Sequence, residues 1–246
     1  MTDVVLREDN GRITTLILNR PDALNAITME MFEQLRAHID DIANAGTAIG
    51  CIILRGNGRA FSAGHDLTDI EGGGELENAN YQAATLEALA GLPQPTIAAV
   101  HGYCFTGALE VALATDLIIV DEKTILADTH TQWGLTPVWG MTQRLPRRIG
   151  QSRAKDLMFS SRRVGASEAY SIGLVDKVVG EGQLVQETQA YAESIVVNSP
   201  YSQTAIKTIL AKTDGLRIDD GLDYEYTNSP GACQDMLERV TKFTKK

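Results

Sequence analysis

The sequence has few cysteines, few aromatic residues and no long apolar run. Its three cysteines, Cys51, Cys104 and Cys233, are too few and too scattered for a disulfide framework or a zinc site. We interpret them as buried, reduced thiols of a cytosolic protein. The most apolar stretch, residues 108–120, is interrupted by Glu110 and Asp116. No segment therefore approaches the roughly 20 apolar residues that a membrane span needs.

Positive charge is also scarce. Lys and Arg number 22 against 32 Asp and Glu, which gives a net charge of −10. This balance excludes a general binder of nucleic acid or anionic membranes, but it is compatible with a small anionic ligand held by backbone dipoles. The first 20 residues lack the apolar run of a signal peptide and carry acids, unlike a transit peptide. We expect a cytoplasmic protein.

What is present is an ordinary core-forming composition, with 43% hydrophobic and 22% charged residues. Residues 4–6 and 13–18 read as two strands joined at Asn10-Gly11, a pair that suits a hairpin turn. Thr28 is a candidate N-cap for a helix whose apolar positions recur every three or four residues (Phe32, Leu35, Ile39 and Ile42). Strands predicted at 51–54, 96–100 and 117–120 alternate with helices, so we predict an α/β fold.

Two other stretches differ from this pattern. Residues 71–78 (EGGGELEN) predict a mobile surface loop, followed by a helix from about Ala79 to Leu89. The last third is mostly helical, with helices predicted at 184–197, 201–212 and 232–243. We therefore predict a core over residues 1–197 and a helical C-terminal subdomain over residues 198–246.

Two glycine-containing turns carry the chemistry. Residues 60–67 (AFSAGHDL) follow one predicted strand, and residues 100–110 (VHGYCFTGALE) form a strand, a turn and the start of a helix. Glycine allows close backbone approach, and the first N–H groups of a helix lack internal partners. Two such groups from separate turns could bind an oxygen that gains negative charge, which is an oxyanion hole. The alternative interpretation is that these glycines only form tight turns that pack against the core.

These two segments resemble the crotonase, or enoyl-CoA hydratase/isomerase, superfamily. The resemblance extends over most of residues 1–180, in the order and spacing of the family. It includes Asn19-Arg20-Pro21 with Leu24-Asn25-Ala26, Gly134-Leu135-Thr136-Pro137 with Thr142-Gln143-Arg144-Leu145, and AYSIGLVDKVV at 169–179.

The resemblance implies a crotonase-type spiral of ββα units that binds acyl-CoA thioesters, with the helical C-terminus forming trimers or hexamers. It implies an oxyanion hole made by the backbone N–H groups of His65 and Gly107. It implies no metal and no separate cofactor, since coenzyme A is part of the substrate. We assign substrate contacts to Ala23, Leu24, Ala63, Gly64, Asp66, Leu67 and Trp133. Trp133 and Trp139 lie on either side of the turn at 134–137. Two interpretations of these side chains stay open: packing in the core, or forming a wall of the acyl pocket.

Glu110 matches one of the two hydratase glutamates, and it follows Gly107 by almost one helical turn. Apolar neighbours predict desolvation and a raised pKa for Glu110, which suits proton transfer. The second glutamate of the family falls at position 130, which is His130 here. Histidine also transfers protons near neutral pH, although a residue that only lines the pocket and an incidental replacement are the alternatives for His130. If residues 128–130 are extended, Asp128 shares a face with His130 and orients or charges the imidazole.

We therefore expect an enoyl-CoA hydratase that adds water to a 2-enoyl-CoA, with Glu110 and His130 as catalytic residues. An isomerase is the alternative, because a single carboxylate can shuttle a proton between two carbons. Another crotonase-fold reaction, such as C–C cleavage or thioester hydrolysis, and an acyl-CoA binder without catalysis also stay open.

Overall fold

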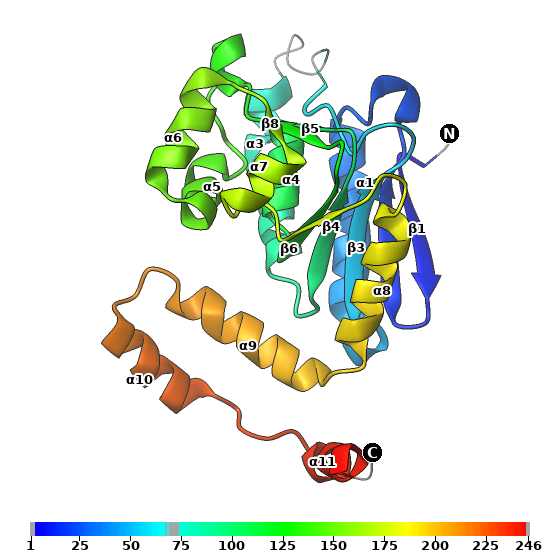
Figure 1. The fold of residues 1–246 in the computed structure, drawn as a ribbon, viewed down its shortest axis with the longest axis vertical. Coiled ribbons are helices and arrows are strands. Elements are labelled where there is room, and N and C mark those ends of the chain that lie inside the picture. Colours follow the sequence, from blue (N-terminus) through cyan, green and yellow to red (C-terminus); the bar gives the residue numbers. More distant parts are fainter. Residues whose placement is uncertain (1–2, 67, 69–73, 245–246) are drawn as a thin grey trace.

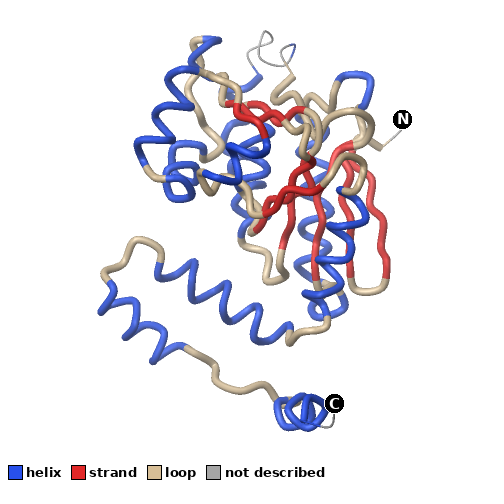
Figure 2. Tube along the Cα trace, in the orientation of Figure 1, coloured by secondary structure: helices blue, strands red, loops and turns tan. Residues whose placement is uncertain are grey.

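A six-stranded sheet forms the centre of the molecule (Figures 1 and 2). The computed structural model describes residues 3–66, 68 and 74–244, and of residues 74–79 it describes the backbone alone. The strands stand in the order β1 (Val5–Asn10), β2 (Ile13–Leu18), β3 (Cys51–Gly56), β4 (Thr96–Val100), β6 (Leu117–Asp121) and β9 (Lys177–Val179). The first pair is antiparallel, which confirms the predicted hairpin, and the other pairs are parallel.

A second, three-stranded sheet contains β5 (Tyr103–Phe105), β7 (Ile125–Ala127) and β8 (Val164–Gly165). The chain runs from β4 through β5 into helix α4 (Gly107–Leu113), and from β6 through β7 toward helix α5 (Met141–Ile149). Each passage is a ββα unit, with one strand in each sheet. The predicted α/β spiral is therefore confirmed.

Helices cover both faces of the large sheet. Helix α1 (Met29–Asn44) begins as predicted at Thr28, whose hydroxyl accepts a hydrogen bond from the Met31 N–H, and its apolar stripe is buried. On one face α1 and α4 pack against strand residues such as Leu54 and Val100. On the opposite face α8 (Leu184–Val196) packs against residues such as Ile53 and Ile97. Strands buried on both sides explain the near-continuous apolar runs of β3 and β4.

Several elements differ from the sequence prediction. Helix α3 (Gly74–Ala90) includes residues 74–78, which we predicted as loop, while 71–73 lie outside the described residues. The sequence reading also did not resolve the three short strands of the second sheet, α5, α6 (Gln151–Ser160) and α7 (Ala166–Ser171).

The chain ends in three helices that extend away from the sheets: α9 (Pro200–Thr213), α10 (Ile218–Asn228) and α11 (Met236–Thr244) (Figure 1). None of the residues that these helices comprise is buried. The helix predicted at 232–243 begins only at Met236, and α10 was not predicted. The division at residue 198 into core and oligomerisation subdomain stays a prediction.

Candidate active site

A cavity of about 460 Å³ opens where the second sheet meets the N-terminus of α4. The loop at 63–66 forms one side, and the segment from His130 to Trp139 forms another. The lining residues are Ala23, Ala26, Ala63, His65, Asp66, Phe105, Thr106, Gly107, Glu110, Ala127, Thr129, His130, Gln132, Trp133, Leu135, Val138, Trp139, Ser161 and Arg163. Every residue that we predicted as catalytic or as an oxyanion donor therefore lines one cavity.

The two predicted oxyanion positions come from neighbouring backbone segments. Gly64 has a φ of +103°, and a Cβ there would lie 2.7 Å from the Phe105 carbonyl oxygen and 3.7 Å from the Gly107 nitrogen. Only glycine therefore lets the loop before His65 approach the start of α4 this closely. Within the described part of the chain, the Gly107 N–H has no hydrogen-bond acceptor.

Thr106, the residue before Gly107, has a strained backbone. Its φ is +53° and its ψ is −110°, a conformation that β-branched residues rarely adopt. The Thr106 N–H donates to the Ala127 carbonyl over 2.8 Å. Its hydroxyl accepts from the Thr129 N–H over 3.1 Å and bonds the Thr129 hydroxyl. These bonds hold the strained turn and connect the Gly107 amide to the segment that carries His130.

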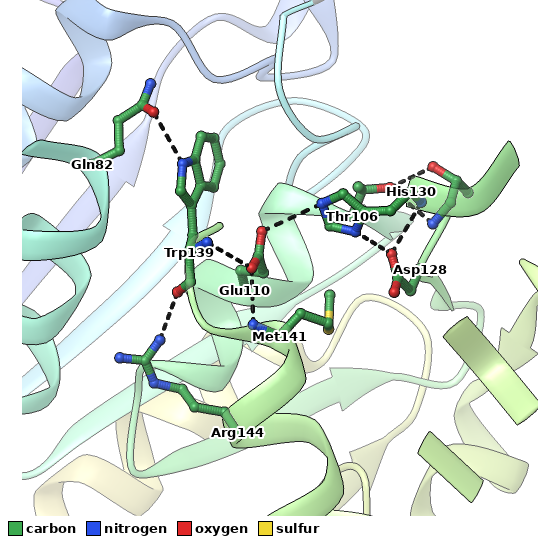
Figure 3. Close-up of polar contacts among 9 residues, drawn as sticks. Gln82, Thr106, Glu110, Asp128, His130, Trp139, Met141 and Arg144 are labelled. Carbon is green, nitrogen blue, oxygen red and sulfur yellow. Dashed lines mark hydrogen bonds and ion pairs between the residues drawn. The ribbon is translucent and has the colours of Figure 1, made fainter. Parts of the chain in front are cut away.

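Glu110 is a buried carboxyl, with 1% of its surface exposed. Its Oε1 accepts hydrogen bonds from the backbone N–H groups of Trp139, at 3.0 Å, and Met141, at 2.9 Å (Figure 3). Burial raises the pKa of Glu110 to about 7, although these two bonds and the nearby His130 favour the charged form. The sequence predicted this direction of the pKa shift from the apolar neighbours of Glu110.

His130 lies between two carboxyls. Its Nε2 is 3.7 Å from Glu110 Oε2, and its Nδ1 is 2.5 Å from Asp128 Oδ1 (Figure 3). Residues 128–130 are not extended, since Thr129 has a ψ of 13° and His130 opens a 3-10 helix, His130–Trp133. Asp128 Oδ1 also accepts from the His130 N–H, at 3.1 Å. The predicted Asp128–His130 contact is therefore made by a turn and not by a shared strand face.

Trp139 organises the inner wall of the cavity. It is 2% exposed, and its Nε1–H donates to Gln82 Oε1 over 3.0 Å. Its carbonyl accepts from Arg144 Nη1 at 2.8 Å (Figure 3). The sequence left open whether this residue packs or lines the cavity, and it does both. The sequence did not predict that the Trp139 N–H holds Glu110, because nearly every residue type has a backbone N–H.

The other predicted substrate contacts divide into three groups. Ala23, Ala63, Asp66 and Trp133 line the cavity. Leu24 and Gly64 are not among the lining residues, but the Leu24 carbonyl accepts a hydrogen bond from the N–H of Ala63, which is. Leu67 lies outside the described residues. Asp66 pairs with Arg20 at 2.8 Å, and hydrogen bonds from Thr68 and Arg20 lower the pKa of Asp66.

The described residues contain no group of three or more His, Cys, Asp or Glu side chains placed to bind a metal ion. No helix among them has the length and apolar character required to cross a membrane.

Comparisons with known proteins agree with this geometry. The sequence model of a family described as enoyl-CoA hydratase/isomerase matches residues 8–238. YngF of Bacillus subtilis is 38% identical over 214 residues, which cover 85% of this chain and 81% of YngF. The short-chain-enoyl-CoA hydratase of Clostridium acetobutylicum is 29% identical over 98% of this chain and 95% of its own. The crystal structure of the enoyl-CoA hydratase from Bacillus anthracis has a TM-score of 0.94 at 31% identity, over 98% of this chain and 96% of that one.

Proposed function

The chain belongs to the enoyl-CoA hydratase/isomerase family, and from this premise we propose that it adds water across the double bond of a 2-enoyl-CoA. It is an enzyme of that family, with a hydratase-like activity on acyl-CoA thioesters. The observation that carries the proposal is the buried Glu110–His130 pair beside the Gly107 amide, in one cavity.

The backbone amides of His65 and Gly107 bind the thioester carbonyl oxygen in this proposal. Water adds to the β-carbon, and the electrons of the double bond move toward that oxygen, which gains negative charge. Hydrogen-bond donors that are fixed before the reaction stabilise such charge without reorganising. The carbonyl re-forms when the α-carbon takes up a proton. Coenzyme A is part of the substrate, and the mechanism invokes no other cofactor.

Glu110 and His130 perform the proton transfers as a pair. One member accepts a proton from the attacking water, and the other donates a proton to the α-carbon. The pair therefore holds one proton before the reaction and one proton after it. Glu110 Oε1 is held by two backbone N–H groups, so Oε2, which faces His130, is the reactive oxygen. Asp128 accepts the Nδ1–H of His130 and leaves Nε2 for the reaction.

Hydration is tested directly with purified protein and a series of 2-enoyl-CoAs. We expect the absorbance of the conjugated thioester to fall and the product to gain the mass of one water. Glu110→Gln should lower kcat by about 10²–10⁴-fold, the usual contribution of a general acid–base group. Glu122→Gln, on the exposed surface, serves as the matched control. Absence of hydration at every chain length would overturn the proposal.

Isomerisation is the second candidate. It is favoured by His130, which stands where a hydratase of this family has its second glutamate. A 3-enoyl-CoA converted without a mass change, with no hydration of 2-enoyl-CoAs, would select the isomerase.

We further propose that the protein forms a homotrimer or a dimer of trimers through residues 198–246. The support is that α9, α10 and α11 expose large apolar side chains, including Ile218, Leu222, Leu237 and Phe243. Such side chains gain free energy when another surface covers them.

A further inference from the structure

Trp139 forms the closed end of the cavity. Its indole lies directly against the Gly107 backbone, where a Cβ on Gly107 would be only 2.4 Å from Cζ3 of the ring. The centroids of the Trp139 and His65 rings are 5.0 Å apart. The indole therefore touches both residues that are proposed to supply the oxyanion amides, on the same side as Glu110.

The ring is fixed in this position. The Nε1–H donates to Gln82 Oε1, and Gln82 on α3 is itself 2% exposed. The Phe32 and Trp139 rings pack in a T-shaped arrangement at a centroid distance of 4.9 Å and an interplanar angle of 75°. Core side chains therefore stand behind the indole, and a ligand reaches no buried space there unless the indole is removed.

The outer wall of the cavity is open. Trp133 and Val138, which also line it, are 55% and 40% exposed. An acyl chain that continues beyond the reacting carbons must therefore turn toward the surface. Methylene groups gain free energy only when they are buried, so the added carbons of a long chain gain little on that side.

We propose that Trp139 limits the length of the acyl chain and makes short-chain acyl-CoA thioesters the preferred substrates. This inference rests on the proposed function, because it takes the thioester carbonyl to lie at the His65 and Gly107 amides. Trp139 acts as a specificity-determining residue: it blocks a buried path toward Phe32, and Gln82 holds it there.

The test compares kcat/KM for crotonyl-CoA and 2-decenoyl-CoA. We expect the native chain to favour crotonyl-CoA. Trp139→Ala opens the path toward Phe32, so the decenoyl-to-crotonyl ratio should rise at least about tenfold, which is the lower bound for a methylene-sized change in an apolar pocket. Trp139→Leu, which removes less volume, is measured in the same way and preserves the test if the alanine variant does not fold.

Two controls separate blocking from general damage. Trp133→Ala removes the same side chain from the open wall, so it should not raise the ratio. Trp139→Phe keeps a ring at the closed end but loses the bond to Gln82, and its ratio should stay closer to that of the native chain than the ratio of Trp139→Ala. A ratio that stays constant in folded Trp139→Ala and Trp139→Leu would overturn the inference.

Binding distinguishes this failure from failure of the proposed reaction. Calorimetric titration with butanoyl-CoA and decanoyl-CoA requires no turnover. If Trp139→Ala binds decanoyl-CoA at least about tenfold more tightly relative to butanoyl-CoA, the blocking role stands even for a chain that hydrates nothing. If the native chain hydrates crotonyl-CoA but the binding ratio does not change, the reaction stands and the blocking role falls.

Discussion

At the scale of single residues, the environment of Glu110 determines what the carboxyl can do. Burial disfavours its charged form, whereas two backbone N–H groups and the neighbouring imidazole favour it. The desolvation is the larger effect, so the pKa of Glu110 rises from 4.5 to about 7. A carboxyl with this pKa takes up and releases protons near neutral pH, as acid–base catalysis requires.

The raised pKa predicts a pH-dependent cost in stability. The folded chain binds the Glu110 proton more tightly than the unfolded chain, so the associated stability is present below pH 4.5 and is lost as the pH rises to about 7. Relative to Glu110→Gln, the free energy of unfolding of the native chain should fall by up to about 3 kcal/mol across this interval and then stay level. Urea unfolding of both proteins at several pH values measures the difference. A constant difference would show that the pKa of Glu110 is not raised.

Asp128 is a positioning residue for His130. Its Oδ1 accepts two hydrogen bonds from His130, while Oδ2 has no hydrogen-bond partner among the described residues. We expect Asp128→Asn to lower kcat by about 10²-fold or more. The asparagine no longer provides a carboxylate that fixes the tautomer of the imidazole and stabilises its charged form.

The pH profile reports this role specifically. A pair that must hold one proton gives a bell-shaped profile of kcat/KM. Without the negative charge of Asp128, a second proton binds less readily, so the acidic limb of the profile should move to lower pH. Asp121→Asn removes another buried carboxylate and should leave the profile in place. A fall in kcat with both limbs unmoved would indicate a structural role alone.

The sequence predicted part of this residue-level arrangement. Glu110 and His130 could be chosen from side-chain type and spacing, and they do face one another. The hydrogen bonds from the Trp139 and Met141 N–H groups to Glu110 could not be predicted. Nearly every residue type has a backbone N–H, and only the fold brings these two N–H groups close to the carboxyl.

At the scale of elements, the loop before His65 and the start of α4 fit together only through glycine. A Cβ at Gly64 would meet the Phe105 carbonyl oxygen, a backbone atom, at 2.7 Å, and the φ of +103° is unfavourable for alanine. We expect Gly64→Ala to lower the free energy of unfolding by about 1–3 kcal/mol. It should also lower kcat/KM, because the two segments must separate and the proposed oxyanion amides then move apart.

Gly182→Ala is the matched control for Gly64→Ala. Gly182 also has a positive φ, +74°, but its Cβ would meet nothing within 4 Å. Its substitution should affect stability through the backbone conformation while kcat/KM stays near the native value. Equal losses of activity in the two variants would contradict the fit between the loop and α4.

Elements with long periodic patterns were predictable, and short ones were not. Helix α1 carries an N-cap and an apolar stripe over 16 residues, and both were confirmed. Strands β5 and β7 contain three residues each, which is too short for an alternating pattern to emerge. These strands form because they pair with each other across the second sheet, between residues 22 positions apart such as Cys104 and Leu126. A pattern within the local sequence does not indicate such a pairing.

At the scale of the whole molecule, the large sheet and the C-terminal helices differ in whether their apolar side chains are covered. The large sheet is covered by helices on both faces, so its apolar strands are buried. The helices after residue 198 bury none of their residues within the described chain. On α10, Ile218, Leu222 and Tyr226 recur every four residues and are 75%, 56% and 91% exposed. One apolar stripe therefore faces outward along this helix, which is unusual for a monomer.

This stripe predicts self-association. Light scattering after size-exclusion chromatography should give a mass that is a multiple of 26.7 kDa, three or six copies in the proposed assembly. Replacing both Ile218 and Leu222 with Glu puts charges where apolar contacts are expected, so the mass should fall toward that of one copy at equal concentration. Val185→Glu, on α8 outside the three terminal helices and 62% exposed, should leave the mass unchanged. A single-copy mass for the native chain at micromolar concentration would contradict the assembly, and an unchanged mass in the double variant would place the interface away from α10.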